Sequence, residues 1–209
     1  MDQSTSLPQR RTQKDRREST QRGVLEATLR CIGRVGYASV SLNEVAKDAG
    51  VSRGAITHHY ASKLELAAAA MEHFFTARYE RLMSLLADKS TLSLDERLDI
   101  LGKEFEDLFP IGFEIIVALR TDPELQARYD ALAMDRYEEM TQGYERMFPE
   151  FAKAQSPRLL IAVVAAFYRG LFIEGFSSDR ERLAQMAELF KAMLRTYVAK
   201  GLSPDRKSG

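Results

Sequence analysis

The side chains best suited to bind an anion lie between residues 41 and 63, in SLNEVAKDAGVSRGAITHHYASK. Arg53 and Thr57 would share the outward face of a short helix, whose first turn offers free backbone N–H groups and the positive end of the helix dipole. Gly54 costs that helix about 0.5 to 1 kcal/mol relative to Ala, so it more plausibly permits the close approach of a partner. Lys63 would begin another helix, where the dipole disfavours a cation unless a phosphate lies nearby. The chemistry indicated is the binding of a phosphate-bearing partner.

Two short helices must position these side chains. Ser41 and Glu44 form a capping box that starts the first helix, and its apolar residues follow the i, i+3, i+4, i+7 spacing of a buried face. Gly50 supplies the left-handed conformation that ends it, and Ser52 is the N-cap of a second helix over about residues 53–59. Two helices separated by so few residues predict a helix-turn-helix.

From Val24 to Leu66 the sequence resembles the DNA-binding domain of the tetracycline-repressor (TetR) family of bacterial transcription regulators. The family's motifs occur in the right order, as Val24-Leu25-Glu26-Ala27, Gly36-Tyr37, Ser41-Leu42, Val45-Ala46, Ala49-Gly50-Val51-Ser52-Arg53-Gly54, His59-Tyr60 and Ser62-Lys63. Thr57 stands where the family usually has Tyr, and Tyr60 where it usually has Phe. The first departure removes a ring that commonly reaches the DNA.

The resemblance implies a DNA-binding repressor that binds a palindromic operator as a homodimer and is released by a small-molecule effector. In such a protein Arg53 and Thr57 would reach base edges, and Ala55 could touch a thymine methyl group. Other side chains would hold phosphates and set the register. The full set of expected DNA-contacting residues is Ser41, Ser52, Arg53, Gly54, Ala55, Thr57, His58, His59 and Lys63.

Two other functions fit parts of the sequence. An architectural DNA-binding protein, or another helical interaction module, would share the basic N-terminal part but need no effector site. An enzyme would rest on His58, His59 and His73, yet neighbouring histidines on a helix point about 100° apart. No H-E-x-x-H, P-loop or G-x-S-x-G motif accompanies them. We therefore expect no catalytic residue, metal ion or cofactor.

Charge is distributed unevenly along the chain. The 209 residues carry 30 basic and 30 acidic side chains, but residues 1–63 hold 11 basic and 6 acidic ones, and residues 64–209 hold 19 basic and 24 acidic ones. The positive part is the part that contains the helix-turn-helix. This asymmetry is typical of a phosphate-binding head on a neutral to acidic body.

The pattern of the whole chain predicts an all-α fold of nine or ten helices, because no alternating strand pattern appears. We expect a three-helix helix-turn-helix DNA-binding domain over residues 18–65. A larger helical domain for effector binding and dimerisation follows over residues 66–202. Residues 1–17 would form a disordered basic arm, and residues 203–209 a disordered tail.

Capping residues and apolar periodicity set the other helix boundaries. Ser93, Asp122 and Ser156 are predicted N-caps, and Pro110 is expected to end the helix before it. The predicted helices span about residues 19–35, 63–87, 94–109, 111–121, 123–148, 157–176 and 180–199. The helix over 63–87 would link the two domains along an amphipathic stripe made of Leu66, Ala70, Phe74, Ala77, Arg78, Leu82 and Leu85 or Leu86.

The last two predicted helices are too apolar to bury a single face each. A monomeric core could absorb them, but the resemblance favours a homodimer held by a four-helix bundle of these two helices from each subunit. The expected dimerisation residues are Leu160, Val164, Phe167, Leu171, Leu183, Met186, Phe190 and Met193. A two-fold dimer would present two recognition helices to two half-sites.

Aromatic and Met side chains are frequent between residues 105 and 172. Such a set is usually core, but the resemblance implies an effector cavity in this region, and these side chains suit a roomy, largely apolar site. The expected effector-binding residues are Phe105, Phe109, Phe113, Arg120, Tyr137, Met140, Tyr144, Phe167 and Tyr168. Arg120 and Arg169 could hold an anionic group, or could be surface or ion-paired arginines.

The single cysteine and the lack of long apolar segments predict the protein's compartment and redox chemistry. The single cysteine, Cys31, excludes an intramolecular disulfide and is expected to be a buried hydrophobe rather than a redox sensor. The N-terminal segment lacks the apolar run of a signal peptide. The longest apolar run, over residues 159–168, is well short of the about 20 residues that a membrane span needs. We therefore expect a cytoplasmic protein.

Overall fold

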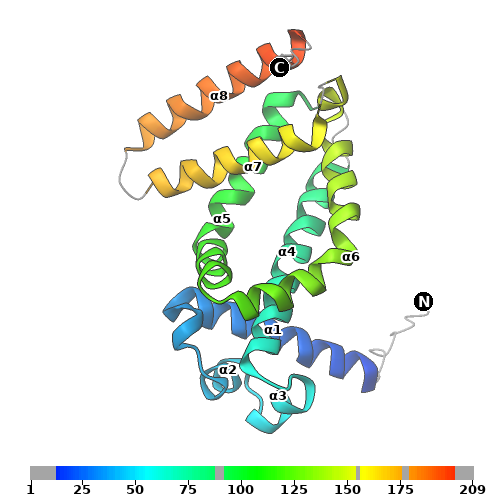
Figure 1. Cartoon of the computed structure of the whole chain (residues 1–209), viewed down its shortest axis with the longest axis vertical. Coiled ribbons are helices and arrows are strands. Elements are labelled where there is room, and N and C mark those ends of the chain that lie inside the picture. The colour runs from blue at the N-terminus through cyan, green and yellow to red at the C-terminus, as the bar shows by residue number, and fades with distance from the viewer. Residues whose placement is uncertain (1–12, 88–91, 154–155, 176–178, 201–209) are drawn as a thin grey trace, which may run out of the picture.

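The computed structural model describes residues 13–87, 92–153, 156–175 and 179–200. Throughout these ranges the regular structure is helical and no strand occurs, which confirms the predicted all-α class. A small head of α1 to α3 lies at one end of the molecule and a larger body, ending in α7 and α8, lies at the other (Figure 1). The predicted tail, 203–209, and residues 1–12 of the predicted arm lie outside the described residues.

The head is built from α1 (Gln13–Ser39), α2 (Leu42–Ala49) and α3 (Arg53–His59), and α4 (Lys63–Ala87) leads out of it. Gly36 has φ 71° and ψ 155°, so α1 is kinked at the residue predicted to end it. The start of α1 differs from the prediction, since the helix begins at Gln13 instead of Ser19. Residues 13–17 of the predicted arm are therefore helical. Polar and charged residues can form an exposed helix without leaving an apolar periodicity in the sequence.

The body contains α5 (Leu94–Thr121), α6 (Pro123–Met147), the 3₁₀ turn η1 (Pro149–Lys153), α7 (Pro157–Glu174) and α8 (Arg180–Lys200). The predicted break at Pro110 is wrong, because Pro110 lies inside the continuous helix α5. A proline removes one helical hydrogen bond and bends the helix, but the turns on either side can hold it together. In Figure 1 α5 changes direction along its length. The described part thus has eight α-helices instead of nine or ten.

The predicted N-caps are mostly confirmed. Ser93 and Glu96 form a capping box, and the Asp122 carboxylate accepts from the Leu125 N–H at 3.0 Å. Ser156 precedes α7 as predicted, but its side chain makes no capping hydrogen bond. Pro157, the first residue of α7, has no N–H group, so this helix start has one backbone donor fewer to cap.

Two hydrophobic cores hold the molecule together. The first buries side chains of α1 to α4 together with Ile115, Ala118 and Leu125, which come from the end of α5 and the start of α6. The second lies in the body and includes Leu98, Phe148 and Phe151. The head core therefore continues into the body and does not stop at residue 65.

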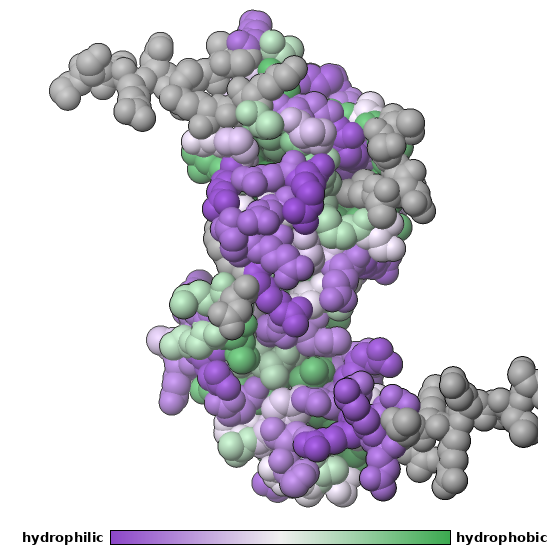
Figure 2. All heavy atoms as spheres, turned by 90° about the vertical axis from the view of Figure 1, so that its right-hand side faces the viewer, coloured by the Kyte–Doolittle hydropathy of each residue, from purple (hydrophilic) through white to green (hydrophobic). Residues whose placement is uncertain are grey.

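The helix α8 lies at the outer edge of the body, against α7 (Figure 1). The buried Lys191 side chain anchors it, because its Nζ donates to Asp99 of α5 and to Glu188, each at 2.6 Å. On the face over α6, most exposed side chains are hydrophilic (Figure 2). None of the described helices is both long and apolar enough to cross a membrane.

Candidate functional site

Caps fix the two helices of the helix-turn-helix in place. The Ser41 Oγ accepts from the Glu44 N–H at 3.3 Å, and the Glu44 carboxylate accepts from the Ser41 N–H at 3.0 Å, as predicted. Gly50 adopts the left-handed conformation, with φ 66° and ψ 31°. The Ser52 Oγ accepts from the Ala55 N–H at 3.1 Å, which starts α3. The predicted helix-turn-helix is confirmed in its boundaries and in its caps.

The helix α3 has one buried and one open face. Ile56 is fully buried in the head core, whereas Arg53, Gly54, Thr57 and His58 are exposed. This exposed set is the outward face that the sequence predicted. The Thr57 hydroxyl lies 3.2 Å from the Gly54 carbonyl and 3.3 Å from the Arg53 carbonyl, to which it donates. Its oxygen remains able to accept a hydrogen bond from outside.

The other residues expected to contact phosphates have partners within the head. The Ser41 hydroxyl donates to Glu44 at 2.8 Å. His59 is half-buried, with its ring centroid 6.4 Å from that of Tyr60. The Lys63 Nζ donates to the Ala38 carbonyl at 2.9 Å and lies 4.7 Å from the centroid of the Tyr37 ring. Burial lowers the pKa of Lys63, although nearby Asp122 acts in the opposite sense.

Ion pairs and close packing connect the head to the body. Arg128 of α6 donates from Nε to both carboxylate oxygens of Glu65 in α4, at 2.8 and 2.9 Å. About two turns further along, Arg136 pairs with Glu72 at 3.2 Å. A Cβ added at Gly33 would lie only 3.1 Å from the Ile111 side chain, so α1 and α5 approach closely there. The head is therefore joined to the body through α4 and through the contact of α1 with α5.

Part of the predicted effector set converges on one residue that the sequence reasoning did not select, Arg78. Its guanidinium carbon lies 3.9 Å from the centroid of the Phe105 ring. Phe105 stacks on Tyr168, with centroids 6.0 Å apart and planes 18° apart. Tyr144 and Glu104 raise the pKa of Arg78, against the larger lowering effect of burial. In the sequence, the sign that Arg78 is partly buried was its position within the apolar stripe of α4.

The remaining predicted effector residues lie elsewhere. Phe109 contacts Phe113 and Phe172, with centroids 5.6 Å apart in both pairs. Phe167 stacks on Phe190 of α8, and Arg120 is exposed at the end of α5. Met140 is half-buried, and the Tyr137 side chain lies outside what the structure describes. A hollow of about 580 Å³ opens between α5, α7 and α8, and it is lined in part by Phe109, Tyr168, Leu171 and Phe172.

The outward face of α7 and α8 differs from the predicted dimerisation set. Val164 is only 1% exposed and packs in the core of its own subunit, so it leaves almost no surface for a partner. Leu160, Phe167, Leu171 and Phe190 pack partly against the same core, Leu183 and Met186 are half-buried, and Met193 is exposed. In a helix that is apolar nearly all round, periodicity does not mark the inner side. The large apolar side chains exposed on these helices, here called the outer face, are Leu159, Val163, Ile173, Leu189 and Met193, which are 46% to 63% exposed.

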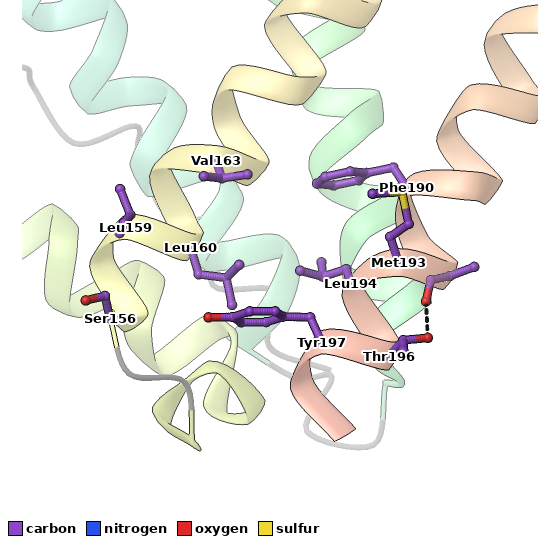
Figure 3. A pocket seen from close by; sticks show the side chains of 10 residues that line it. Ser156, Leu159, Leu160, Val163, Phe190, Met193, Leu194, Thr196 and Tyr197 are labelled. Atoms are coloured by element: carbon purple, nitrogen blue, oxygen red, sulfur yellow. Dashed lines mark hydrogen bonds between the residues drawn. The ribbon is translucent and has the colours of Figure 1, made fainter. Parts of the chain in front are cut away.

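A groove of about 700 Å³ opens beside this outer face, between the start of α7 and the end of α8. Leu160 and Val163 of α7 face Phe190, Leu194 and Tyr197 of α8 across it (Figure 3). The Thr196 hydroxyl at its edge donates to the Ala192 carbonyl at 2.9 Å, so this polar group is satisfied within its own helix. The groove therefore presents apolar surface to a partner.

The remaining polar candidates are structural. Cys31 is fully buried, as predicted, and burial raises the pKa of its thiol. Across the described ranges, no three His, Cys, Asp or Glu side chains gather as metal ligands would. The described residues provide an exposed face on α3, an apolar groove beside the outer face, and a hollow between α5, α7 and α8.

Comparison with known proteins places these surfaces in context. Residues 24–70 match the family described as bacterial regulatory proteins, tetR family. The chain is 37% identical over 122 residues to the HTH-type transcriptional regulator CymR of Pseudomonas putida. That alignment covers 57% of this chain and 60% of the relative, which is less than two thirds of the relative's length.

Two solved structures share the fold over most of both chains. A transcriptional regulator from Pseudomonas aeruginosa PAO1 superposes with a TM-score of 0.65 at 22% identity, covering 90% of this chain and 97% of that one. A transcriptional regulator from Saccharomonospora viridis, solved in complex with choline, superposes with a TM-score of 0.62 at 20% identity, covering 85% of this chain and 96% of that one. The described helices therefore form a fold already known among transcriptional regulators.

Proposed function

The chain belongs to the TetR family of bacterial regulatory proteins and is a transcriptional regulator, and from this premise we propose that it is a ligand-released DNA-binding repressor. It would bind a near-palindromic operator as a homodimer. The observation that carries the proposal is the capped, exposed face of α3.

The recognition chemistry follows from that face. The Arg53 guanidinium can donate two hydrogen bonds to a guanine, and the Ala55 methyl group can contact a thymine methyl group. Gly54 carries no side chain, so the duplex can approach the helix backbone. The residues with partners inside the head, Ser41, Ser52, His59 and Lys63, would contact phosphates at its edges, where they fix position but not sequence.

Dimerisation would be provided by the outer face of α7 and α8. Exposed Leu, Val, Ile and Met side chains gain about 25 cal/mol for each Å² of apolar surface that a second subunit covers. The Saccharomonospora regulator's choline complex supports a small-molecule effector for this chain as well. Such a ligand would release DNA if it bound preferentially the state whose recognition helices are wrongly spaced. The Glu65–Arg128 pair offers a route from the body to the head.

The architectural alternative shares the head but predicts no response to small molecules. Loss of operator binding on addition of a ligand would exclude it. The family comparisons favour a regulator over an enzyme, since the matching proteins are transcriptional regulators.

The test is binding of the purified protein to the DNA upstream of its own gene, over a range of salt concentrations. We expect tight binding that weakens steeply with salt, because bound phosphates release counterions. Arg53→Ala should cost about 1 to 3 kcal/mol and relax specificity at one base pair. Arg146→Ala removes an equal charge from an exposed site on α6 and should leave binding unchanged. Salt-insensitive binding, or an Arg53→Ala protein as tight as its parent, would contradict the proposal.

A further inference from the structure

We infer that the effector is a planar, apolar carboxylate, and that Arg78 is the residue that binds its anionic group. This inference rests on the proposed function, and it names the class of ligand and one binding residue. Two features support it: the buried Nε of Arg78 has no hydrogen-bond acceptor among the described residues, and stacked aromatic rings of α5 and α7 lead to its guanidinium.

A row of aromatic rings from two other helices ends at Arg78. Arg78 comes from α4, Phe105 from α5, and Tyr168, which stacks on Phe105, from α7. The Phe105 ring lies directly against the guanidinium, with its centroid 3.9 Å from the guanidinium carbon. Burial lowers the pKa of Arg78, and the positive charge of Arg169 on α7 acts in the same direction.

Within the described residues, the buried Nε of Arg78 has no hydrogen-bond acceptor. The neighbouring carboxylate, Glu104, is bonded instead to Arg81, with Arg81 Nε and Glu104 Oε1 2.9 Å apart. A buried donor without an acceptor is costly, more so when it is charged. The carboxylate of a ligand would satisfy it, and the fork of the guanidinium suits a carboxylate in two-point contact. The competing explanation is a small shift that pairs Arg78 with the buried, unpartnered Oε2 of Glu104.

The surroundings of Arg78 select a flat, apolar ligand. The Phe105 and Tyr168 rings are stacked, and Gly102 makes this possible, since an added Cβ would lie 2.7 Å from the Tyr168 ring. Tyr168 also lines the hollow of about 580 Å³, so two rings separate that hollow from Arg78. An aromatic acid could insert between such rings and gain stacking as well as apolar burial. A cationic ligand would be repelled by Arg78 and Arg169.

Binding at Arg78 would act on the DNA-binding end through α4. The same helix carries Glu65, which is bonded to Arg128, and it begins at Lys63, four residues after α3 ends at His59. An anion that draws Arg78 to a new position therefore moves the helix that follows the recognition helix. By linkage, operator DNA should weaken ligand binding by the same factor as the ligand weakens operator binding.

The experiment measures binding of 2-naphthoate and of neutral 2-naphthamide to the full-length protein by calorimetry, with benzoate and indole-3-acetate as further carboxylates. We expect the parent to bind at least one carboxylate, and to prefer naphthoate to naphthamide by about tenfold or more. Arg78→Gln should lower naphthoate affinity by about 30-fold or more, as does removal of one partner of a buried ion pair. Arg78→Lys should keep part of the affinity, and Arg146→Gln, the matched charge control, should keep all of it.

Circular dichroism checks that each variant is folded, and the comparison of acid with amide in the parent protein tests the inference without any variant. Equal affinity for acid and amide, no binding of any carboxylate, or a folded Arg78→Gln protein with parental affinity would overturn it. The last result would favour the Arg78–Glu104 pair. Operator binding by the ligand-free parent tests the proposed function separately, so the two can fail independently.

Discussion

Several side chains that are proposed to contact DNA also hold the head together. Ser41 and Ser52 cap helices, and Lys63 is bonded to the Ala38 carbonyl, although all three are expected to contact phosphates. A phosphate approaching Lys63 must compete with that carbonyl and with the Tyr37 ring. Lys63, which is proposed to bind the DNA backbone, therefore also connects the start of α4 to the end of α1.

The Ser41–Glu44 capping box makes the stability of the head depend on pH. Hydrogen bonds from the Ser41 side chain and backbone lower the pKa of Glu44 below its ordinary value of 4.5. Because the folded pKa is below the unfolded one, the stabilisation is present above pH 4.5 and is lost as pH falls through the folded value.

We therefore expect Glu44→Gln to lower the melting temperature at neutral pH but not at the acidic end of the folded range. Thermal unfolding followed by circular dichroism across this range measures the difference. Glu96→Gln should give the same sign, since the Ser93 backbone and side chain lower the pKa of Glu96 in the same way. A difference that stays constant through the acidic range would contradict the expectation.

At the scale of elements, the turn between α2 and α3 decides where the recognition helix points. Gly50 ends α2 with a positive φ of 66°, and the Val51 N–H donates to the Ala46 carbonyl at 3.0 Å, so the chain reverses within a few residues. Gly54, four residues later, lies in regular helix on the exposed face. The two glycines are therefore needed for different reasons.

Gly50→Ala and Gly54→Ala should change stability in opposite directions. An added Cβ at Gly50 meets no atom within 4 Å, so its cost is backbone strain alone, about 1 to 2 kcal/mol. At Gly54 the nearest atom is the Ser52 Oγ at 3.8 Å, and alanine should stabilise the helix by up to about 1 kcal/mol. Urea unfolding measures both changes.

Operator affinity separates the two glycines further. Gly54→Ala should weaken DNA binding although the protein is more stable, because the new methyl group stands between α3 and the duplex. A Gly54→Ala protein with unchanged affinity would mean that the backbone does not approach the DNA at this point.

At the scale of the whole molecule, shared packing joins the head to the body, and exposed apolar surface is the proposed site of contact between subunits. The head core includes Ile115 and Leu125 of the body, so the two parts cannot move independently. The outer face of α7 and α8 leaves Leu189 and Met193 more than 60% exposed, which is costly for a subunit alone.

Leu189→Glu or Met193→Glu should convert a dimer into monomers, since each buries an unpaired charge in the interface at a cost of roughly 3 to 5 kcal/mol. Sedimentation equilibrium measures the change, and operator affinity should fall with it because only one half-site is then read at a time. Met134→Glu is the matched control, because Met134 is 76% exposed on α6, outside the outer face. A parent protein that sediments as a monomer would rule out this interface.

Local chemistry in the sequence was sufficient for the caps of α2 and α3, for Gly50 and for the exposed face of α3, because each depends on residues within one or two helical turns. The tertiary structure alone decided that α5 continues through Pro110, that Val164 lies inside its subunit while Val163 faces outward, and that Arg78 lies against Phe105. These outcomes depend on which distant helices pack together. The type of an apolar or charged residue does not identify its partner, because the partner depends on which helices pack beside it.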